Sequence, residues 1–554
     1  MSAAAAPRSA GRRSLPGWPA DRPLRAWQTA ALDVLDAHEG DAFLASATPA
    51  AGKTTFGLHV AHRMLRAGAV RRVVVVAPTT HICRQWALDA GHYGIDLEPN
   101  RPNADGPEPA DRHGIAVTYQ TVAAGPAVHR RRAAAVPTLL IADEPHHMGD
   151  QAAWGRSAQE AFGPCVRKLL LSGTPFRSDN TAIPWVVYDD EGVSRADYGY
   201  SYTQALLDRV CRPITFCTYD GDMEWVSDGR VRRADFTVAL PAAEAARRLR
   251  TALDPDGDWI GQLLRDADTR LRELRAGDHP DAGGLVVAAD KEHAEQLAAR
   301  LGRINGERPP IVTSDDPNAS RRIAAFRASG EPWLVSVLMV SEGVDIPRLR
   351  VGVYATPART ELFFRQVVGR FIRRTPQPRD QMAWLFLPSD PRLKRLAGAI
   401  EEERNHALEL APAASDEAVE ALDRAAASDA AFRALSSGAA RLDDELLQTT
   451  NPGDQLGLFG APDKPKASPA LSAFTTTTAA PAAGERESAS ERRERLRDER
   501  QALVAVISRR TGEPYRSIHA RINKRTGAAS VAAATAAQLE KGNALLEREA
   551  ARGR

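Results

Sequence analysis

The 554-residue chain has little of several features that would assign it to a class at once. Its four cysteines form no C-x-x-C pair, which disfavours a disulfide framework or a zinc site and indicates a reducing, cytoplasmic setting. No apolar run approaches the roughly 18 residues of a membrane span, and residues 1–22 lack an apolar signal core, so we expect a disordered tail there. The net charge of only +2 means that any surface that attracts nucleic acid must be local.

Short apolar segments alternate with helix-compatible segments from residue 23 onward. The first series is AFLASA, RVVVVAP, GIAVTY, TLLIADE and KLLLSGT, at residues 42–47, 72–78, 114–119, 138–144 and 168–174. The second is GLVVAAD, PPIVTSD, WLVSVLM, RVGVYAT and MAWLFLP, at residues 284–290, 309–315, 333–339, 350–356 and 382–388. Because buried parallel strands are continuously apolar, we predict an α/β fold with two doubly wound parallel sheets, in lobes 23–210 and 211–395 with a cleft between them.

The remaining segments differ from the lobes in composition. Residues 396–447 are rich in Ala, Glu and Arg and are predicted to be helical, and residues 448–490 are a flexible linker rich in Pro, Thr and Ala. Residues 491–554 are predicted to form a small helical module. Tyr198, Tyr200 and Tyr202, near the end of the first lobe, could pack in the core or face nucleic acid, and we expect core packing.

The segment ASATPAAGKTTF, residues 45–56, is similar to a phosphate-binding loop with glycines missing. It follows an apolar strand and precedes a helix-compatible run, which is the context that such a loop requires. The loop is predicted to hold nucleotide phosphates through its backbone N–H groups and the helix N-terminus. Lys53 would reach the β- and γ-phosphates, and the Thr54 hydroxyl would bind Mg²⁺. The expected nucleotide-binding residues of the loop are Ala47, Thr48, Pro49, Ala50, Ala51, Gly52, Lys53, Thr54 and Thr55.

An acidic pair follows at the end of a predicted strand, in LLIADEPHH. Asp143 would hold Mg²⁺, and Glu144 would position and deprotonate the attacking water. The alternative, a solvated helix start, leaves the co-occurrence with Lys53 unexplained. The sequence therefore predicts an ATP-hydrolysing site.

Together these segments resemble superfamily 2 helicases and translocases, in particular the DExH group with the type III restriction helicase-like proteins. The resemblance covers about residues 23–390 and implies two RecA-like lobes. In that superfamily the loop often has the form A-x-x-G-x-G-K-T, so Ala47 fits, whereas Ala50 replaces a glycine. Alanine there requires a negative φ or tolerates mild strain, which puts the affinity for ATP in question.

The resemblance assigns further roles in the first lobe. LRAWQ implies that Gln28 contacts adenine, and APTTHICRQW and TYQT, at residues 77–86 and 118–121, resemble elements that touch the nucleic-acid backbone. SGTP implies that Ser172 and Thr174 couple hydrolysis to strand movement, with His146 of the DExH motif linking the two activities.

Three segments of the second lobe resemble motifs IV, V and VI: GLVVAADKEHAEQLA, VSEGVDIPRL and QVVGRFIRR. The resemblance places Gly343 and Asp345 of motif V at the nucleotide. Gln366, Arg370 and Arg373 of motif VI would close on ATP and stabilise the phosphoryl charge.

The substrate class is less constrained than the ATP chemistry. DEPHH differs from the D-E-A-D of the RNA-directed group, which favours a DNA helicase or translocase. The alternatives are an RNA helicase, or a non-unwinding ATPase switch that recruits partners in phage defence or replication. The segment DQLGLFG resembles the bacterial sliding-clamp-binding peptide, with Gln455, Leu456, Leu458 and Phe459 as the docking residues.

The C-terminal module carries a local basic charge. Residues 501–527 hold six basic residues and one acidic residue, and EPYRSIHARINKRTG predicts a helix closed by Gly527, followed by another helix. This arrangement suggests DNA binding, and the alternative is a docking or oligomerisation helix with a solvated charged face. The preceding ERRERLRDER has mixed charges and is expected to be solvated.

Overall fold

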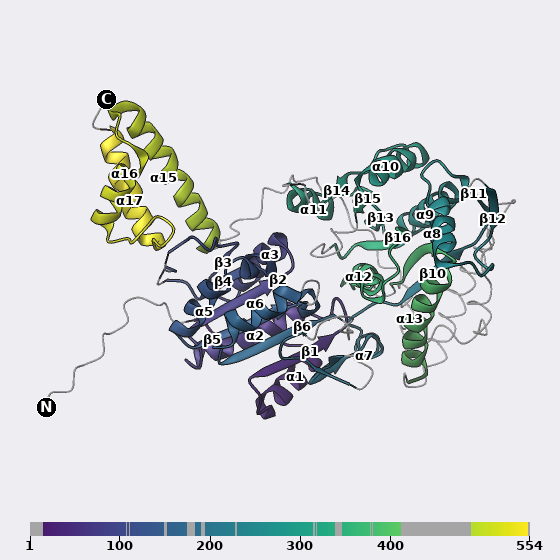
Figure 1. Ribbon diagram of the computed structural model, residues 1–554, viewed down its shortest axis with the longest axis horizontal. Helices are drawn as coiled ribbons and strands as arrows, with labels where there is room; N and C mark the ends of the chain where they lie inside the picture. Colours follow the sequence, from purple (N-terminus) through teal and green to yellow (C-terminus); the bar gives the residue numbers. More distant parts are fainter. Residues whose placement is uncertain are drawn as a thin grey trace, which may run out of the picture. The chain divides into compact units, whose positions relative to one another are not determined.

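A computed structural model describes residues 15–551 with gaps. The gaps are residues 107, 110, 149–151, 174–182, 190–193, 228–229, 314–315, 317, 338–345, 377, 379–380 and 411–488. Contacts divide the chain into two compact units (Figure 1). The first comprises residues 1–45, 53–198 and 468–554, and the second comprises residues 46–52 and 199–467.

A seven-stranded sheet forms the first α/β lobe, in the order β3-β4-β2-β5-β6-β1-β9. Its strands are β1 Ala42–Ala47, β2 Arg72–Ala77, β3 Leu97–Pro99, β4 Gly114–Thr118, β5 Thr138–Asp143, β6 Arg167–Ser172 and β9 Tyr198–Tyr200. Strands β3, β4, β2, β5 and β6 pair in parallel, and the valines of RVVVVA are buried on both faces. This is the doubly wound α/β arrangement expected from the apolar runs.

The helices of this lobe alternate with its strands along the chain. They are α1 Ala26–Ala37, α2 Lys53–Arg66, α3 Thr80–Gly91, α4 Tyr119–Ala123, α5 Pro126–Ala135, the 3-10 helix η1 Pro145–Met148, and α6 Ala152–Phe162. Helices α2 and α3 contact each other, and α4, α5 and α6 form a second group. A short antiparallel pair, β7 Val187–Tyr188 and β8 Ser194–Arg195, lies outside the main sheet.

The second lobe has a six-stranded parallel sheet in the order β10-β17-β16-β13-β15-β14. Its strands are β10 Ile214–Tyr219, β13 Gly283–Ala288, β14 Ile311–Val312, β15 Trp333–Val337, β16 Leu349–Ala355 and β17 Ala383–Pro388. The helices are α7 Tyr202–Leu207, α8 Ala242–Ala252, α9 Asp258–Ala276, α10 Lys291–Asn305, α11 Ala319–Ala328, α12 Glu361–Phe371 and α13 Pro391–Leu410. An antiparallel hairpin of β11 Met223–Ser227 and β12 Arg230–Ala234 was not predicted, and neither was β10.

Three helices form the C-terminal module: α15 Ala489–Thr511, α16 Tyr515–Thr526 and α17 Ala536–Ala551 (Figure 1). They share an apolar core of Val504, Ile507, Ile518, Ile522 and Leu546. Helix α16 ends where predicted, at Gly527, whose φ of 71° is a left-handed conformation that favours glycine.

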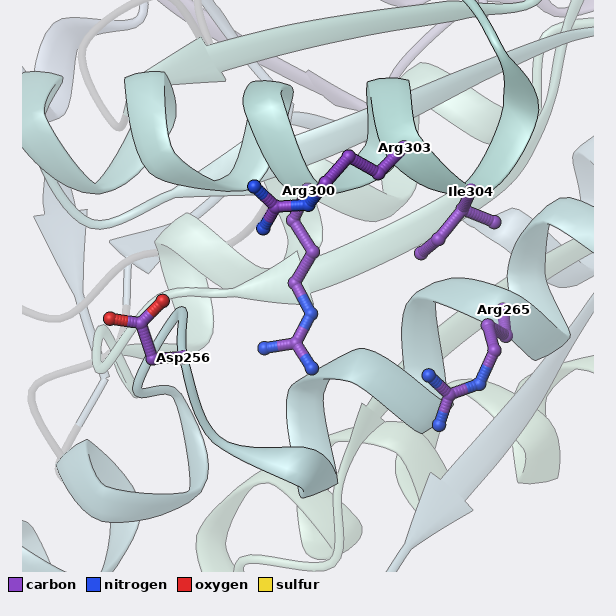
Figure 2. Close-up of a pocket in the computed structure, with 5 residues that line it drawn as sticks. All are labelled: Asp256, Arg265, Arg300, Arg303 and Ile304. Atoms are coloured by element: carbon purple, nitrogen blue, oxygen red, sulfur yellow. The ribbon is translucent and has the colours of Figure 1, made fainter.

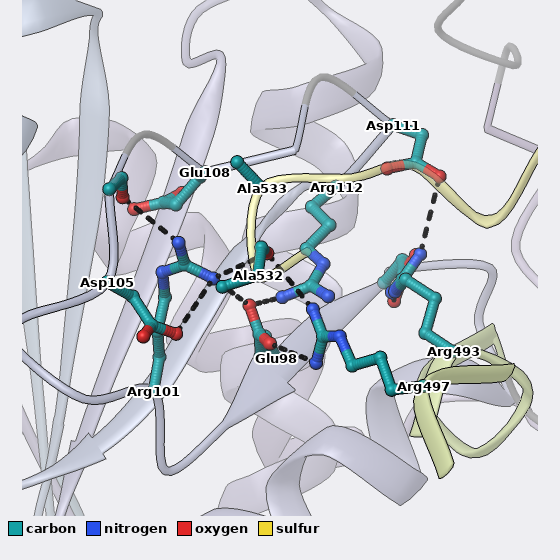
Figure 3. A network of polar contacts seen from close by, with 12 residues as sticks. Glu98, Arg101, Asp105, Glu108, Asp111, Arg112, Arg493, Arg497, Ala532 and Ala533 are labelled. Carbon is teal, nitrogen blue, oxygen red and sulfur yellow. Dashed lines mark hydrogen bonds and ion pairs between the residues drawn. The ribbon is translucent and has the colours of Figure 1, made fainter. Parts of the chain in front are cut away.

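The start of α15 is solvated on one side only, because its other side docks on the first lobe. Arg493 and Arg497 reach carboxylates of the first lobe that surround β3, and Arg493 is almost fully buried (Figure 3). Two arginines of ERRERLRDER therefore form a docking surface, because Arg493 and Arg497 are neutralised by carboxylates far away in the sequence.

Residues 15–22, which were predicted to belong to a disordered tail, contact the first lobe. The Trp18 ring stacks on Tyr93 with ring centroids 4.1 Å apart, and the Pro16 carbonyl lies 2.8 Å from Nε2 of His62. Tyr200 and Tyr202 are buried, which confirms core packing for both. No helix among the residues that the structure describes is both long and apolar enough to cross a membrane.

Candidate nucleotide-binding site

The predicted phosphate loop connects β1 to α2, as its sequence indicates. Strand β1 ends at Ala47 and α2 begins at Lys53. Between them, Gly52 has a φ of 94° and Ala50 a φ of 68°. Alanine pays about 1–2 kcal/mol in the left-handed region, so Ala50 carries the strain that the missing glycine would avoid. The loop nevertheless adopts the compact turn, closed by a hydrogen bond of 3.1 Å from Ala51 N to Thr48 O.

Lys53 meets the second residue of the acidic pair. Its Nζ lies 3.2 Å from Oε1 of Glu144, and both side chains are largely buried. Glu144 has a φ of 51°, a second left-handed conformation, and its N–H donates to Leu171 O at 2.8 Å. The backbone strain at Glu144 turns the chain sharply after β5 and directs this carboxylate to Lys53.

Asp143 is the last residue of β5 and is oriented by two aromatic side chains. Nε1 of Trp86 donates to Oδ2 of Asp143 at 2.8 Å, and the Tyr119 hydroxyl donates to the Asp143 backbone carbonyl at 2.9 Å. Sequence reasoning missed both roles, because Trp86 and Tyr119 lie in segments that the resemblance assigns to the nucleic-acid backbone. Trp86 fixes the carboxylate of Asp143, and Tyr119 fixes its backbone.

The predicted coupling residues also gather at Glu144. Nδ1 of His146 lies 3.6 Å from Oε2 of Glu144, and the Ser172 hydroxyl is 3.5 Å from the same oxygen, at the limit of a hydrogen bond. Gly173 N donates to this oxygen at 3.0 Å. Burial opposes ionisation of Glu144, but Lys53, His146 and the Gly173 N–H outweigh it and hold the pKa of Glu144 well below its usual value.

The loop itself contacts residues of the second unit, to which residues 46–52 belong. Thr48 N donates to Tyr200 O at 2.9 Å, and the Cys211 thiol lies 3.6 Å from Pro49 O. A Cβ atom on Gly369 would lie 2.3 Å from Cβ of Pro49. The glycine of QVVGRFIRR is therefore required by close approach to the loop, a role that sequence reasoning did not assign.

The other predicted residues are placed as follows. Gln366 and Arg370 lie one turn apart on α12, and Arg373 follows the helix, where it pairs with Cys211 in a β-bridge. Gln28 is buried, and its Oε1 accepts a hydrogen bond of 2.8 Å from Arg25 N. Thr54 and Thr55 lie in the first turn of α2. Thr174, Gly343, Asp345 and the clamp-like residues Gln455, Leu456, Leu458 and Phe459 lie outside the described residues.

These residues fit ATP with Mg²⁺. The N-terminus of α2 and the Lys53 ammonium suit phosphate oxygens, and the Asp143 carboxylate, together with the Thr54 hydroxyl, suits a hard cation. A carboxylate that remains ionised, Glu144, lies beside them. The arrangement can bind a polyphosphate and remove a proton from water.

A separate cationic cavity of about 320 Å³ lies in the second unit (Figure 2). It is lined by Asp256, Arg265, Arg300, Arg303 and Ile304. Burial, together with Arg265 and Arg303, lowers the pKa of Arg300. The excess of guanidinium groups favours anions at this cavity, which no sequence motif indicated.

Residues 22–177 match the family model described as type III restriction enzyme, res subunit. The chain is 41% identical to an uncharacterized protein of Mycobacterium tuberculosis (strain H37Rv) over 94% of this chain and 91% of that protein. It is 39% identical to an uncharacterized protein of Mycobacterium leprae (strain TN), over 94% of this chain and 92% of that protein. The chain belongs to one family with these mycobacterial proteins, and its residues 22–177 form a helicase-like domain of superfamily 2.

Among solved structures, the chain is similar to an ATP-dependent Type ISP restriction-modification enzyme, LlaBIII, bound to DNA. The TM-score is 0.46 with 13% identity, over 70% of this chain and 31% of that chain. It is also similar to S. cerevisiae Dbp5 bound to RNA and ADP BeF3, with a TM-score of 0.45 and 14% identity over 68% of this chain and 87% of that chain. The predicted α/β architecture, with two main sheets and a helical region at the C-terminus, is confirmed.

Proposed function

We propose that this protein is an ATP-dependent DNA helicase or translocase. The observation that carries the proposal is the Lys53–Glu144 ion pair of 3.2 Å beside an Asp143 carboxylate held by Trp86. A structural ion pair would not need a strained backbone at Glu144 or two aromatic donors on Asp143. The backbone strain is costly, and together with the two hydrogen bonds it fixes the positions of the two acidic residues beside Lys53.

The chain's own residues suggest how the site works. In the free protein Lys53 neutralises Glu144. When ATP with Mg²⁺ binds, Lys53, Thr54 and Asp143 would hold it, and the bound group supplies the phosphoanhydride that is cleaved. Lys53 then pairs with phosphate, which releases Glu144 to orient a water molecule and accept its proton at a carboxylate oxygen.

His146 and Ser172 extend this exchange to neighbouring segments. Both lie against the Oε2 atom of Glu144. A shift of Glu144 toward water would change their contacts, and also that of Gly173, whose N–H donates to the same oxygen. The roles predicted for Gln366, Arg370 and Arg373, to stabilise phosphoryl charge, and for Gly343 and Asp345, to bind nucleotide, belong to the same proposal.

DNA is the proposed track because DEPHH follows the DExH pattern. An RNA helicase and a non-unwinding ATPase switch are the alternatives. Docking of residues 455–459 on a bacterial sliding clamp stays a prediction, as does a cytoplasmic location.

The test is ATP hydrolysis by the purified chain alone, with single-stranded DNA, with duplex DNA and with RNA, alongside Lys53→Ala. We expect stimulation by DNA that the substitution abolishes. Stimulation by RNA alone would replace the DNA proposal. ATP-driven displacement of a labelled strand then separates a helicase from a switch, because a switch hydrolyses ATP without displacing the strand.

A further inference from the structure

Some basic residues of the C-terminal module are neutralised by carboxylates, and others are not. Two neutralised arginines, Arg493 and Arg497, lie at the base of the module, where the module docks on the first lobe (Figure 3). Arg497 Nη1 donates to Oε1 of Glu98 at 3.0 Å, and Nη2 donates to Ala532 O at 3.0 Å. Arg493 pairs with Asp96 and lies 3.5 Å from Oδ2 of Asp111.

This docking fixes the module on the lobe. Glu98 also accepts from Arg101 at 2.7 Å and pairs with Arg112, so one carboxylate serves three guanidinium groups. Ala536 N donates to Oδ2 of Asp111 at 3.2 Å, which ties the start of α17 to the same surface. The base arginines are thus occupied and shielded from any external ligand.

The body of the module holds α16 in a fixed orientation. Ile518 and Ile522 pack in the module core, and Arg500, fully buried, donates to Oδ1 of Asn523 at 2.7 Å. Arg521 is held by Glu549 at 2.8 Å and by Glu513 at 2.9 Å. One half of the helix is therefore turned inward, and its other half is free to meet a partner.

The outward half of α16 carries cations and small residues but no carboxylate. Arg516, Ala520 and Lys524 follow one another at intervals of four residues, and Ser517, Arg521 and Arg525 form the adjacent row. Arg516, Lys524 and Arg525 are exposed, and among the described residues neither Arg516 nor Lys524 has an ion-pair partner, whereas Arg525 contributes to lowering the pKa of Glu549. We name Arg516, Lys524 and Arg525 the α16 basic face.

We propose that the α16 basic face binds the phosphate backbone of a nucleic-acid duplex while the base of the module remains docked on the first lobe. Unneutralised cations attract phosphates and release their counterions, and the small side chains of Ser517 and Ala520 allow a backbone to approach closely. Arg516 and Lys524 lie about 12 Å apart along the helix axis, enough to reach more than one phosphate. The inference rests on the proposed function, since it adds a second contact with the nucleic acid along which the protein moves.

The test compares Arg516→Ala/Lys524→Ala with Arg492→Ala/Arg495→Ala in the full chain. The second variant is a matched control, because it removes two exposed cations of the same module that pair with Glu540 and Glu499. Binding of a labelled DNA duplex is measured by fluorescence anisotropy without ATP, over a series of salt concentrations. The same duplex sequence as RNA forms a second arm.

We expect the α16 variant to bind at least about tenfold more weakly and to lower the slope of log K against log salt by about 2, whereas the control binds like the parent. Arg516→Lys/Lys524→Arg should restore binding, and basal ATP hydrolysis should not change in any of these variants. The proposal would be overturned if the α16 variant and the control variant both bound duplex like the parent. It would also be overturned if both variants lost the same amount of duplex affinity.

The proposed function and this inference fail differently. Lys53→Ala should bind duplex like the parent, because it leaves the α16 basic face intact. If the parent hydrolyses no ATP but binds duplex through α16, only the ATPase proposal fails. If the parent hydrolyses ATP but binds neither the DNA duplex nor the RNA duplex, the proposed role of the α16 basic face is refuted.

Discussion

Two charged clusters of the first unit use the same chemistry and differ in how fully their groups are satisfied. In the nucleotide site, Lys53 is the one lysine or arginine paired with Glu144 among the described residues, at 3.2 Å. In the docking cluster, Glu98 is shared by Arg101, Arg112 and Arg497, and Arg493 has two carboxylate partners. A single pair can exchange its partner for a phosphate, whereas a shared network loses several bonds if one member leaves.

The two clusters also differ in their backbone conformation. Strain is present at Ala50 and Glu144 in the nucleotide site, as expected where charged groups must be aligned for chemistry. In the docking cluster, burial and the neighbouring Arg493 and Arg497 lower the pKa of Arg112, so the network depends on its carboxylates. The contrast separates a site built for exchange from an interface built to persist.

The strongest way to break the comparison is Glu144→Gln. The amide cannot accept the proton of the attacking water, so we expect ATP hydrolysis to fall by about 10²–10⁴ while nucleotide binding remains. Glu160→Gln, an exposed carboxylate of α6, is the control and should hydrolyse ATP normally. Steady-state hydrolysis and nucleotide binding are measured on both, and an unimpaired Glu144→Gln would remove Glu144 from the chemistry.

Glu98→Gln tests the docking cluster in the same way. The substitution leaves three buried or half-buried guanidinium groups without their common carboxylate, so we expect a loss of about 3–5 kcal/mol in unfolding free energy. Glu499→Gln removes the exposed pair with Arg495 and should cost under about 1 kcal/mol.

Denaturant titration measures the stability of each, and limited proteolysis reports release of residues 489–551. Arg497→Ala is the milder variant if Glu98→Gln does not fold. If residues 489–551 resist proteolysis in Glu98→Gln and in Arg497→Ala as they do in the parent, the apolar contacts alone hold the module on the lobe.

The pH dependence of stability sharpens the account of Lys53. The pKa of Glu144 is lowered, so its contribution to stability is present above the usual value of 4.5 and is lost as pH falls through the folded value. Lys53→Met removes the cation, and burial then raises that pKa. We expect the melting temperature of Lys53→Met to be about 2–4 °C below the parent at pH 7, with a smaller difference at pH 3. A constant difference at both pH values contradicts the assigned cause.

Ala50→Gly should have the smallest effect on the free energy of unfolding, and it should stabilise the protein. Relief of about 1–2 kcal/mol of left-handed strain, less about 0.5–1 kcal/mol for the entropy of glycine, leaves a gain of about 0.5–1 kcal/mol. Ala51→Gly is the control with the opposite sign, because Ala51 is fully buried and has no positive φ. Thermal unfolding distinguishes them, and destabilisation of both would show that Ala50 is not strained.

Continuous apolar runs made the central strands predictable, because a strand buried on both faces must be apolar throughout. The short β3 and the edge strand β10 were missed, since ITFCTY of β10 mixes polar and apolar residues and LEP of β3 is only three residues long. The sequence also does not show the sign of φ at Ala50, which tertiary contacts decide.

The site was predictable where its residues lie in short motifs. The contacts of Glu144 with Lys53, His146 and Ser172 arise because these residues lie at or after the carboxyl ends of strands, and their roles in the chemistry stay predictions. Trp86 was not predictable as a partner of Asp143, and neither was the pairing of Arg493 with Asp96, whose residues are 397 positions apart. Such contacts depend on the register of whole elements, which no local pattern encodes.

The most direct test measures DNA-stimulated ATP hydrolysis of Glu144→Gln and Arg497→Ala side by side with the parent. If one cluster performs chemistry and the other maintains structure, Glu144→Gln loses hydrolysis with and without DNA, and Arg497→Ala retains the basal rate. Basal hydrolysis that survives in Glu144→Gln and disappears in folded Arg497→Ala would contradict the account.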